Sequence, residues 1–172
     1  MIGSLAPDFT LNDLAGMTHT LSEQRGRMVV VNFWSAECPW SRRGDEALAG
    51  LLPDWLARGA AAWGIASNAS EPEYEIRAEI ADRGAAYPIL LDPGNVVADR
   101  YGAVSTPHFY VVDAEGRVRY AGALDDATFR ARAGKTRYLA DAVAALLAGR
   151  APEPAETPAY GCTIVRVRNL PG

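Results

Sequence analysis

The sequence predicts an α/β domain with a mixed central sheet flanked by helices. A nearly continuous apolar run at residues 28–34 is typical of a central strand buried on both faces. Further short apolar runs alternate with helix-like segments, and the pattern closes with two strands and a helix. At 172 residues and 49% hydrophobic composition, the chain has enough apolar material for one domain with its own core.

The first half of the domain is expected to begin with the strand Met28–Trp34, followed by a helix from Pro39. Proline fits the first turn of a helix because its missing N–H would be unpaired there anyway. Apolar residues recur at helical spacing until Gly59, with a kink expected at Pro53. The apolar stretch 60–67 then predicts a second strand.

The next helix is predicted from its start and stop signals. Ser70, with Glu73 three residues later, has the pattern of a capping box. Gly84 marks the end, since glycine readily adopts the left-handed conformation that terminates helices. Two ion pairs are expected at i,i+4 spacing: Glu73 with Arg77, and Glu79 with Arg83.

The second half of the domain is expected to contain three more strands and two more helices. Glycine at position 116 suits a hairpin turn, and Gly149 ends the last helical pattern. The predicted elements are strand 88–91, helix 95–101, strands 109–113 and 118–124, and helix 136–148.

The composition changes after Gly149. The prolines of APEPAETPAY indicate an extended surface linker, and a brief alternating pattern follows in GCTIVRVRNLPG. We therefore divide the chain into a domain over residues 1–149 and a cysteine-containing tail over residues 150–172.

Charge and hydropathy exclude several function classes. With 17 Lys and Arg against 21 Asp and Glu, the chain has a net charge of -4 and no basic face for nucleic acid. No apolar stretch approaches the roughly 18 to 20 residues of a membrane span. The N-terminus MIGSLAPDFT lacks the regions of a signal peptide, so we expect a cytoplasmic location. The two cysteines and the histidines His19 and His108 have no zinc-ligand spacing, so neither a metal nor another cofactor is expected.

Cys38 is the candidate nucleophile. It stands where the predicted strand ends and the helix begins, and unpaired helix N–H groups and the helix dipole favour a thiolate there. The alternative is an inert buried cysteine, but its position and Pro39 favour the reactive interpretation. Ser41, one helical turn later, either hydrogen-bonds the sulfur or is only a helix surface residue. A hydroxyl at that position does not resolve a mixed disulfide as a second thiol would.

The segment STPHFYVVD is the second landmark. If Pro107 is cis, it holds a tight bend and presents the backbone of Thr106 for pairing with an extended peptide near the sulfur. His108 is either an acid or base or, as we favour, an outward-facing strand histidine without a catalytic role.

Taken together, these stretches resemble the redoxin branch of the thioredoxin superfamily, which includes the alkyl hydroperoxide reductase/thiol-specific antioxidant (AhpC/TSA) proteins and bacterial thiol:disulfide oxidoreductases. The similar segments are GSLAPDFTL (3–11), VVVNFW (29–34) leading into Cys38 and Pro39, RYGAVSTPHFYVVDAEGRVRYAG (100–122) and GCTIVR (161–166). The resemblance implies a thioredoxin-like fold with an N-terminal extension and a C-terminal tail.

The resemblance also implies a redox activity. The leading hypothesis is a thiol oxidoreductase whose partner is a thiol or disulfide protein, or a small thiol as electron donor. The alternatives are a thiol peroxidase with antioxidant activity, which reduces hydroperoxides, and a non-catalytic binding module. In place of the W-C-P-x-C pattern of the oxidoreductases this chain has ECPWS, so Glu37 and Ser41 replace the tryptophan and the second cysteine.

The peroxiredoxin pattern P-x-x-x-T-x-x-C is also incomplete. Ser35 stands in for the threonine, but Val31 occupies the proline position, and Thr106 holds the place of an arginine. A peroxide site needs donors that polarise the O–O bond, and Arg42 or Arg100 would have to supply them.

The role of Cys162 follows from the resemblance, because similar redoxins have a lone active-site Cys-Pro and a C-terminal G-C-x-I segment. Cys162 would then resolve the intermediate formed at Cys38, either in the same chain or in a neighbouring one. The sequence leaves the oligomeric state open. The alternative is that Cys162 is an unpaired tail cysteine. Thirteen residues separate Gly149 from Cys162 and span roughly 40 Å when extended, enough to reach the site. The expected catalytic residues are Cys38, Cys162, Ser41 and Ser35, and the expected substrate-binding residues are Pro39, Trp40, Thr106, Pro107 and His108.

Overall fold

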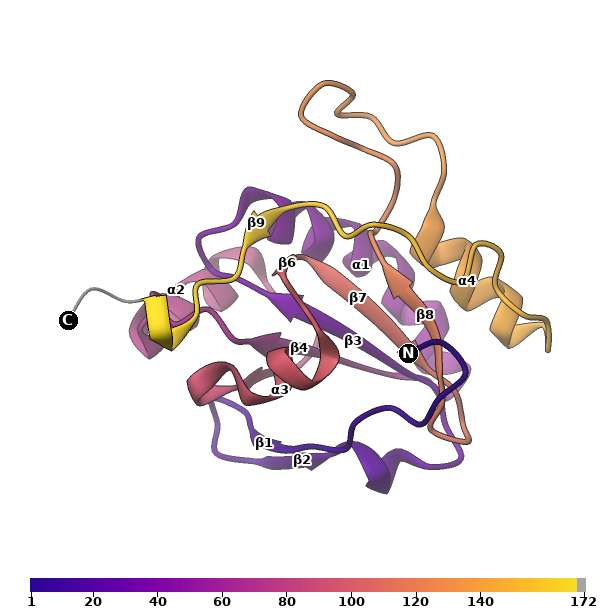
Figure 1. The fold of residues 1–172 in the computed structure, drawn as a ribbon, viewed down its shortest axis with the longest axis horizontal. Helices are drawn as coiled ribbons and strands as arrows, with labels where there is room; N and C mark the ends of the chain where they lie inside the picture. Colours follow the sequence, from indigo (N-terminus) through magenta and orange to yellow (C-terminus); the bar gives the residue numbers. More distant parts are fainter. Residues whose placement is uncertain (170–172) are drawn as a thin grey trace.

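The computed structural model describes residues 1–169, and a five-stranded mixed sheet forms its centre (Figure 1). The strand order is β5-β4-β3-β7-β8. The three strands β3, β4 and β5 are parallel, whereas β7 is antiparallel to both β3 and β8. This arrangement confirms the predicted α/β class with a mixed sheet. The bounds are β3 (Val29–Trp34), β4 (Ala61–Ala66), β5 (Ile89–Leu91), β7 (His108–Val112) and β8 (Val118–Gly122).

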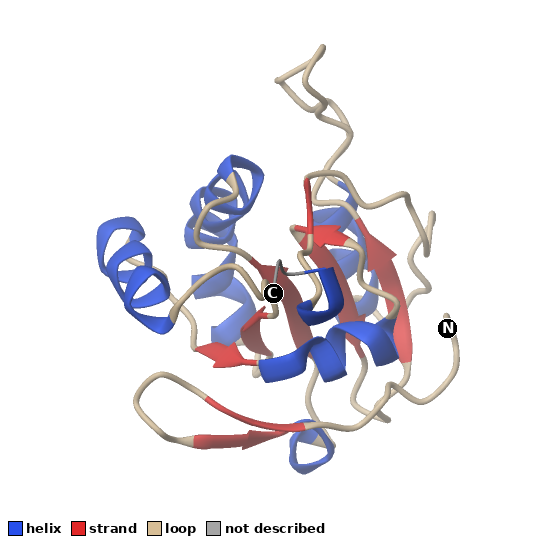
Figure 2. Cartoon of the chain, turned by 60° about the vertical axis from the view of Figure 1, so that its left-hand side comes forward, coloured by secondary structure: helices blue, strands red, loops and turns tan. Residues whose placement is uncertain are grey.

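Helices cover both faces of this sheet (Figures 1 and 2). Alternate side chains of β3 point to opposite faces, so Val30 and Trp34 join one apolar cluster while Val31 and Phe33 join the other. Helices α1, α2 and α4 contribute to the first cluster, and α3 contributes to the second. The bounds are α1 (Pro39–Ala57), α2 (Glu73–Arg83), α3 (Val96–Tyr101) and α4 (Tyr138–Leu147).

Four short strands were not predicted from the sequence. An N-terminal hairpin consists of β1 (Thr10–Asn12) and β2 (Thr18–Thr20), and a separate pair joins β6 (Ser105–Thr106) to β9 (Cys162–Thr163). Each is only two or three residues long, which is too short for local pattern to predict a strand, although β9 lies within the brief alternating pattern noted in the tail.

The start of α2 differs from the prediction. The residue before the helix is Pro72, and no side chain caps its first turn, so the capping box at Ser70 and Glu73 was wrong. Proline already holds the extended backbone conformation that precedes a helix. Gly84 ends α2 in the left-handed conformation, as predicted. Both expected ion pairs are present: Arg77 with Glu73 at 2.5 Å and Arg83 with Glu79 at 2.9 Å.

The proline-rich part of the tail has no regular secondary structure, yet it is bound to the domain. Ala121 of β8 donates its N–H to Ala155 at 3.0 Å and accepts that of Thr157 at 3.0 Å. From there the tail crosses the end of the sheet, shown in yellow in Figure 1. The prediction of an extended surface linker did not include these contacts with β8. Residues 170–172 of the predicted tail lie outside the described residues.

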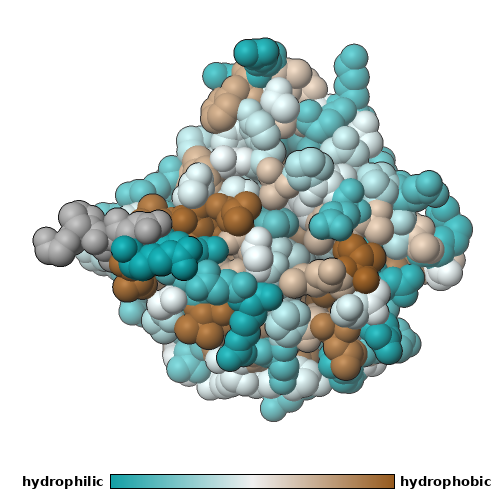
Figure 3. All heavy atoms as spheres, viewed as in Figure 1, coloured by the Kyte–Doolittle hydropathy of each residue, from teal (hydrophilic) through white to brown (hydrophobic). Residues whose placement is uncertain are grey.

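On the face shown in Figure 3, apolar side chains are interspersed with polar ones. None of the helices within residues 1–169 combines the length and apolar character needed to cross a membrane.

Candidate active site

Cys38 lies at the predicted junction between β3 and α1. It is the residue before the helix, with Pro39 in the first turn, and only 1% of it is exposed. Its sulfur donates a hydrogen bond to the Thr106 carbonyl at 3.1 Å and lies 2.8 Å from the sulfur of Cys162. Both cysteines are free thiols. We expected helix N–H groups at the sulfur; within the described residues, no helix amide bonds to this side chain.

The tail covers Cys38 by adding a strand beside it. Thr106 pairs with Cys162 in an antiparallel register, and Ile164 donates its N–H to the carbonyl of Val104 at 3.0 Å. The bond between Thr106 and Pro107 is cis, as the sequence analysis considered. The backbone expected to receive an extended peptide is therefore occupied by the chain's own cysteine segment.

The thiol of Cys162 is held in its protonated form. Burial, the hydrogen bond with Cys38 and the charge of Cys38 raise its pKa to about 12. At neutral pH Cys162 is therefore mainly a thiol, which is a poor nucleophile because thiolates rather than thiols attack.

Ser41 and Ser35 hold the loop that leads into Cys38. Ser41 is fully buried and so is not a surface residue; its hydroxyl accepts the N–H of Ser35 at 3.1 Å. The Ser35 hydroxyl donates to the carboxylate of Glu71. Within residues 1–169, the contacts of these hydroxyls are with the loop and Glu71 instead of the sulfur.

Glu71 is a site residue that the sequence analysis missed. Its buried carboxylate accepts the N–H of Ala36 at 2.9 Å and that of Glu37 at 3.1 Å, in addition to the Ser35 hydroxyl. A glutamate between a serine and a proline is expected in solvent, so no local pattern marks it. Glu71 thus fixes the backbone that positions Cys38.

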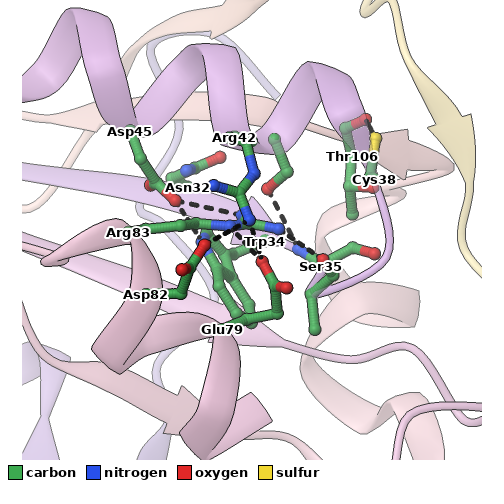
Figure 4. A network of polar contacts seen from close by, with 12 residues as sticks. Asn32, Trp34, Ser35, Cys38, Arg42, Asp45, Glu79, Asp82, Arg83 and Thr106 are labelled. Carbon is green, nitrogen blue, oxygen red and sulfur yellow. Dashed lines mark hydrogen bonds and ion pairs between the residues drawn. The ribbon is translucent and has the colours of Figure 1, made fainter. Parts of the chain in front are cut away.

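A buried ion pair between Arg83 and Asp45 supports the same loop (Figure 4). The side chains of Arg83 and Asp45 are 2% and 5% exposed and 3.1 Å apart. Arg83 also donates to the carbonyl of Ala36, and Asp45 accepts from Trp34 at 2.8 Å and from Tyr87 at 2.5 Å. Burial and the charge of Asp45 raise the pKa of Tyr87 well above its usual range.

Two arginines considered as peroxide-polarising donors are bound elsewhere. Arg42 pairs with Glu79 and Asp82 at 2.8 Å each, and Arg100 donates to the carbonyl of Asp8 at 3.2 Å. In the described part of the chain, the hydrogen-bond partners of the Cys38 sulfur are Thr106 and Cys162.

Trp40 lies in an aromatic cluster that binds the tail. Its ring centroid is 5.0 Å from that of Tyr160 and 5.3 Å from that of Phe129, both in edge-to-face geometry. The Tyr160 hydroxyl accepts the N–H of Phe129 at 2.9 Å. Phe129 belongs to the loop between β8 and α4, which protrudes at the top of Figure 1. The cluster therefore joins the active-site helix, the protruding loop and the tail.

His108 is half-buried at the start of β7, so it does not face outward as we favoured. Its ring lies 4.6 Å from that of Tyr110, and burial lowers its pKa to about 4. The imidazole is therefore neutral at neutral pH.

His108 is expected to make the protein less stable in mild acid. Because the folded-state pKa lies below the unfolded value of 6.5, the unfolded chain binds the proton more readily between those values. Stability is full above about pH 6.5 and falls as the pH drops toward about 4. We expect His108→Gln to reduce the acid-induced loss in unfolding free energy by up to about 3 kcal/mol. Urea unfolding of both proteins at several pH values between these two pKa values measures the difference. Parallel pH profiles for the two proteins would contradict the assignment.

Gly161 is expected to be essential for docking of the tail. A Cβ at this position would overlap the carbonyl oxygen of Thr106 and would lie 2.7 Å from its carbon. We expect Gly161→Ala to release the tail and to speed alkylation of Cys38 by iodoacetamide about 10-fold or more. Gly50→Ala is the matched control, because nothing lies within 4 Å of that position. Unchanged alkylation in Gly161→Ala would show that the overlap does not control docking.

Comparisons with known proteins agree with this geometry. Residues 2–121 match the model of the AhpC/TSA family. The thiol-disulfide oxidoreductase ResA of Geobacillus thermodenitrificans is 34% identical over 119 residues, which are 69% of this chain and 67% of that protein.

Two solved structures extend the comparison to the fold. A hypothetical protein of Sinorhizobium meliloti has a TM-score of 0.84 at 35% identity, covering 95% of this chain and 93% of that one. The thioredoxin domain of a thiol-disulfide oxidoreductase from Bacteroides vulgatus has a TM-score of 0.63 at 28% identity, covering 69% and 85%. These neighbours confirm the predicted thioredoxin-like fold.

Proposed function

This chain belongs to the AhpC/TSA family and is a thiol oxidoreductase, and we propose that it reduces disulfides with Cys38 as the attacking thiolate and Cys162 as the resolving thiol. The observation that carries the proposal is the 2.8 Å separation of the two sulfurs. Two thiols at this distance are placed to exchange a disulfide within one chain.

The reaction would proceed in two exchange steps. The Cys38 thiolate attacks one sulfur of a substrate disulfide, forms a mixed disulfide and releases the other sulfur as a thiolate, which takes up a proton. Cys162 then loses its proton and attacks the sulfur of Cys38. The products are the reduced substrate and a Cys38–Cys162 disulfide, so two electrons pass from the protein to the substrate.

The pKa of Cys162 supports this order. Two of the causes that raise it come from Cys38 itself. Both vanish once the sulfur of Cys38 is bound in a mixed disulfide. Cys162 is then easier to ionise at the stage when the mechanism requires its thiolate.

The rigid loop before Cys38 supports a catalytic role over a binding module. Glu71 accepts the N–H of Ala36, and Arg83 donates to its carbonyl, so both backbone groups of this residue are bonded. A nucleophile acts efficiently when surrounding residues keep it in one position.

A thiol peroxidase is the second candidate, and the family match favours it. Cys38 would be oxidised by a hydroperoxide to a sulfenic acid, with loss of the alcohol or water, and Cys162 would condense with it and release water. Arg42 and Arg100 are bonded to other groups, which disfavours this chemistry because neither side chain is then placed to polarise the O–O bond.

Trapping of the intermediate tests the proposal. The reduced protein is mixed with oxidised glutathione and analysed by non-reducing mass spectrometry. We expect wild type to form the Cys38–Cys162 disulfide and release glutathione, and Cys162→Ser to stop as a glutathione adduct on Cys38. A stable adduct on wild-type Cys38, or a first adduct on Cys162, would overturn the proposed order. A reaction with hydrogen peroxide that outpaces the disulfide reaction would instead favour the peroxidase.

A further inference from the structure

We propose that the site beside Cys38 that tail residues 160–164 occupy, called the groove below, selects extended peptides in which the reactive cysteine follows a glycine and an aromatic residue lies immediately before that glycine. The inference rests on the proposed function, because it names the substrate class of the same thiol. It is carried by the tail segment 160–164, which lies in the groove with its own cysteine against Cys38.

The tail occupies the positions that a substrate peptide would need. Cys162 pairs with Thr106 in antiparallel register, which brings its sulfur to 2.8 Å from that of Cys38. An external peptide that pairs its backbone with Thr106 and brings its sulfur to Cys38 has to adopt the same register as the tail. Each residue of the tail therefore marks a subsite of the groove.

The position before the cysteine accepts only glycine. At Gly161 a Cβ would overlap the Thr106 carbonyl oxygen, and it would lie 3.1 Å from Cδ of Pro107. Both obstacles are at the cis Thr106–Pro107 bend beside Cys38. Any side chain at this position of a peptide forces the strand away from the sulfur.

The position two residues before the cysteine fits an aromatic ring. The Tyr160 ring is 5.0 Å from Trp40 and 5.6 Å from Phe129, in edge-to-face geometry with both. Phe129 is 65% exposed although its ring contacts those of Trp40 and Tyr160. A pocket of about 290 Å³ beside this position is lined by Pro39, Trp40, Arg43, Phe129 and Arg132, which leaves room for a larger ring.

The tail and a substrate peptide exclude each other, since both need the backbone of Thr106. Tail contacts continue past the cysteine to Ile164, which is 3% exposed, and to Val165, whose N–H is bound by Asn68 at 2.7 Å. A test in the full-length chain must therefore compare peptides under identical competition from the tail.

Three activated heptapeptides provide this test. The first is AYGCTIV, the sequence of residues 159–165; the second has alanine in place of the glycine, and the third has alanine in place of the tyrosine. Each cysteine carries a 2-thiopyridyl group as a mixed disulfide. Cys38 of the full-length Cys162→Ser protein attacks the peptide sulfur, forms a Cys38–peptide disulfide and releases 2-thiopyridone, whose absorbance gives the rate.

We expect AYGCTIV to react fastest. The peptide without glycine should react about 10- to 100-fold more slowly, and the peptide without tyrosine about 10-fold more slowly. Adding Trp40→Ala to this background should abolish the tyrosine effect and retain the glycine effect. Rates equal within about twofold for all three peptides would overturn the inference, as would a tyrosine effect that survives Trp40→Ala.

A small disulfide separates failure of this inference from failure of the proposed function. 2,2′-Dithiodipyridine needs no peptide subsites. If it modifies Cys38 while the three peptides react alike, the groove is unselective and only the inference fails. If it leaves Cys38 unmodified in the folded Cys162→Ser protein, the proposed nucleophile itself is wrong.

Discussion

Replacing Cys38 with alanine is expected to abolish disulfide reduction, with a loss of at least about 10³-fold in turnover. The reason is that the substitution removes the attacking thiol, while burial still raises the pKa of the remaining thiol, Cys162, and keeps it mainly protonated at neutral pH. The measurement is the rate of thiol release from a disulfide substrate in the presence of a dithiol reductant, compared with the reaction without protein.

Cys162→Ser is the matched control for this experiment. It should retain the first exchange step but stall as a mixed disulfide, so its single-turnover rate stays near wild type while its multiple-turnover rate falls. If Cys38→Ala keeps substantial turnover, the thiol of Cys162 is itself the nucleophile. Circular dichroism of both variants checks that each retains the fold.

Arg83→Met is expected to cause the largest loss of stability, about 3 to 5 kcal/mol. The substitution leaves Asp45 as an uncompensated charge in a site where its side chain is only 5% exposed. It also removes the hydrogen bond to the carbonyl of Ala36, two residues before Cys38. The free energy of unfolding in urea measures the effect.

Arg42→Met is the matched control for Arg83→Met. Arg42 also contacts Glu79, but its side chain is 40% exposed. Exposed ion pairs contribute about 0 to 1 kcal/mol, so this variant should unfold close to wild type. Similar losses in the two variants would mean that burial of the Arg83–Asp45 pair does not set its contribution.

Local sequence pattern was sufficient to predict the strand and the helices that surround Cys38. The apolar run of β3, the proline that opens α1 and the glycine that ends α2 each act through backbone conformation or burial of neighbouring residues. These signals predict a cysteine between the end of a central strand and the start of a helix, where Cys38 lies. The resemblance to redoxins added the tail cysteine as a candidate, but not its position.

The supporting network was beyond local pattern. Glu71, Asp45 and Arg83 are charged residues, which are exposed by default because burial without a partner is unfavourable. Their partners come from other elements. The contacts of Glu71 and Arg83 with the loop, and the contact between Asp45 and Arg83, join residues 34 to 47 positions apart along the chain. The capping box at Ser70 failed for a related reason, since Pro72 is the residue that precedes α2 and Glu71 is engaged with the loop.

Local sequence pattern was enough to predict the α/β class, the order of the main elements and one cysteine at a strand–helix junction, because these features depend on interactions between near neighbours. The pairing of the tail with Thr106, the burial of Ser41 and the approach of the two sulfurs are features of the packed fold. Those facts depend on contacts such as that between Cys38 and Cys162, which are 124 residues apart. Their free energy comes from surfaces that exist only once the sheet and helices have packed together.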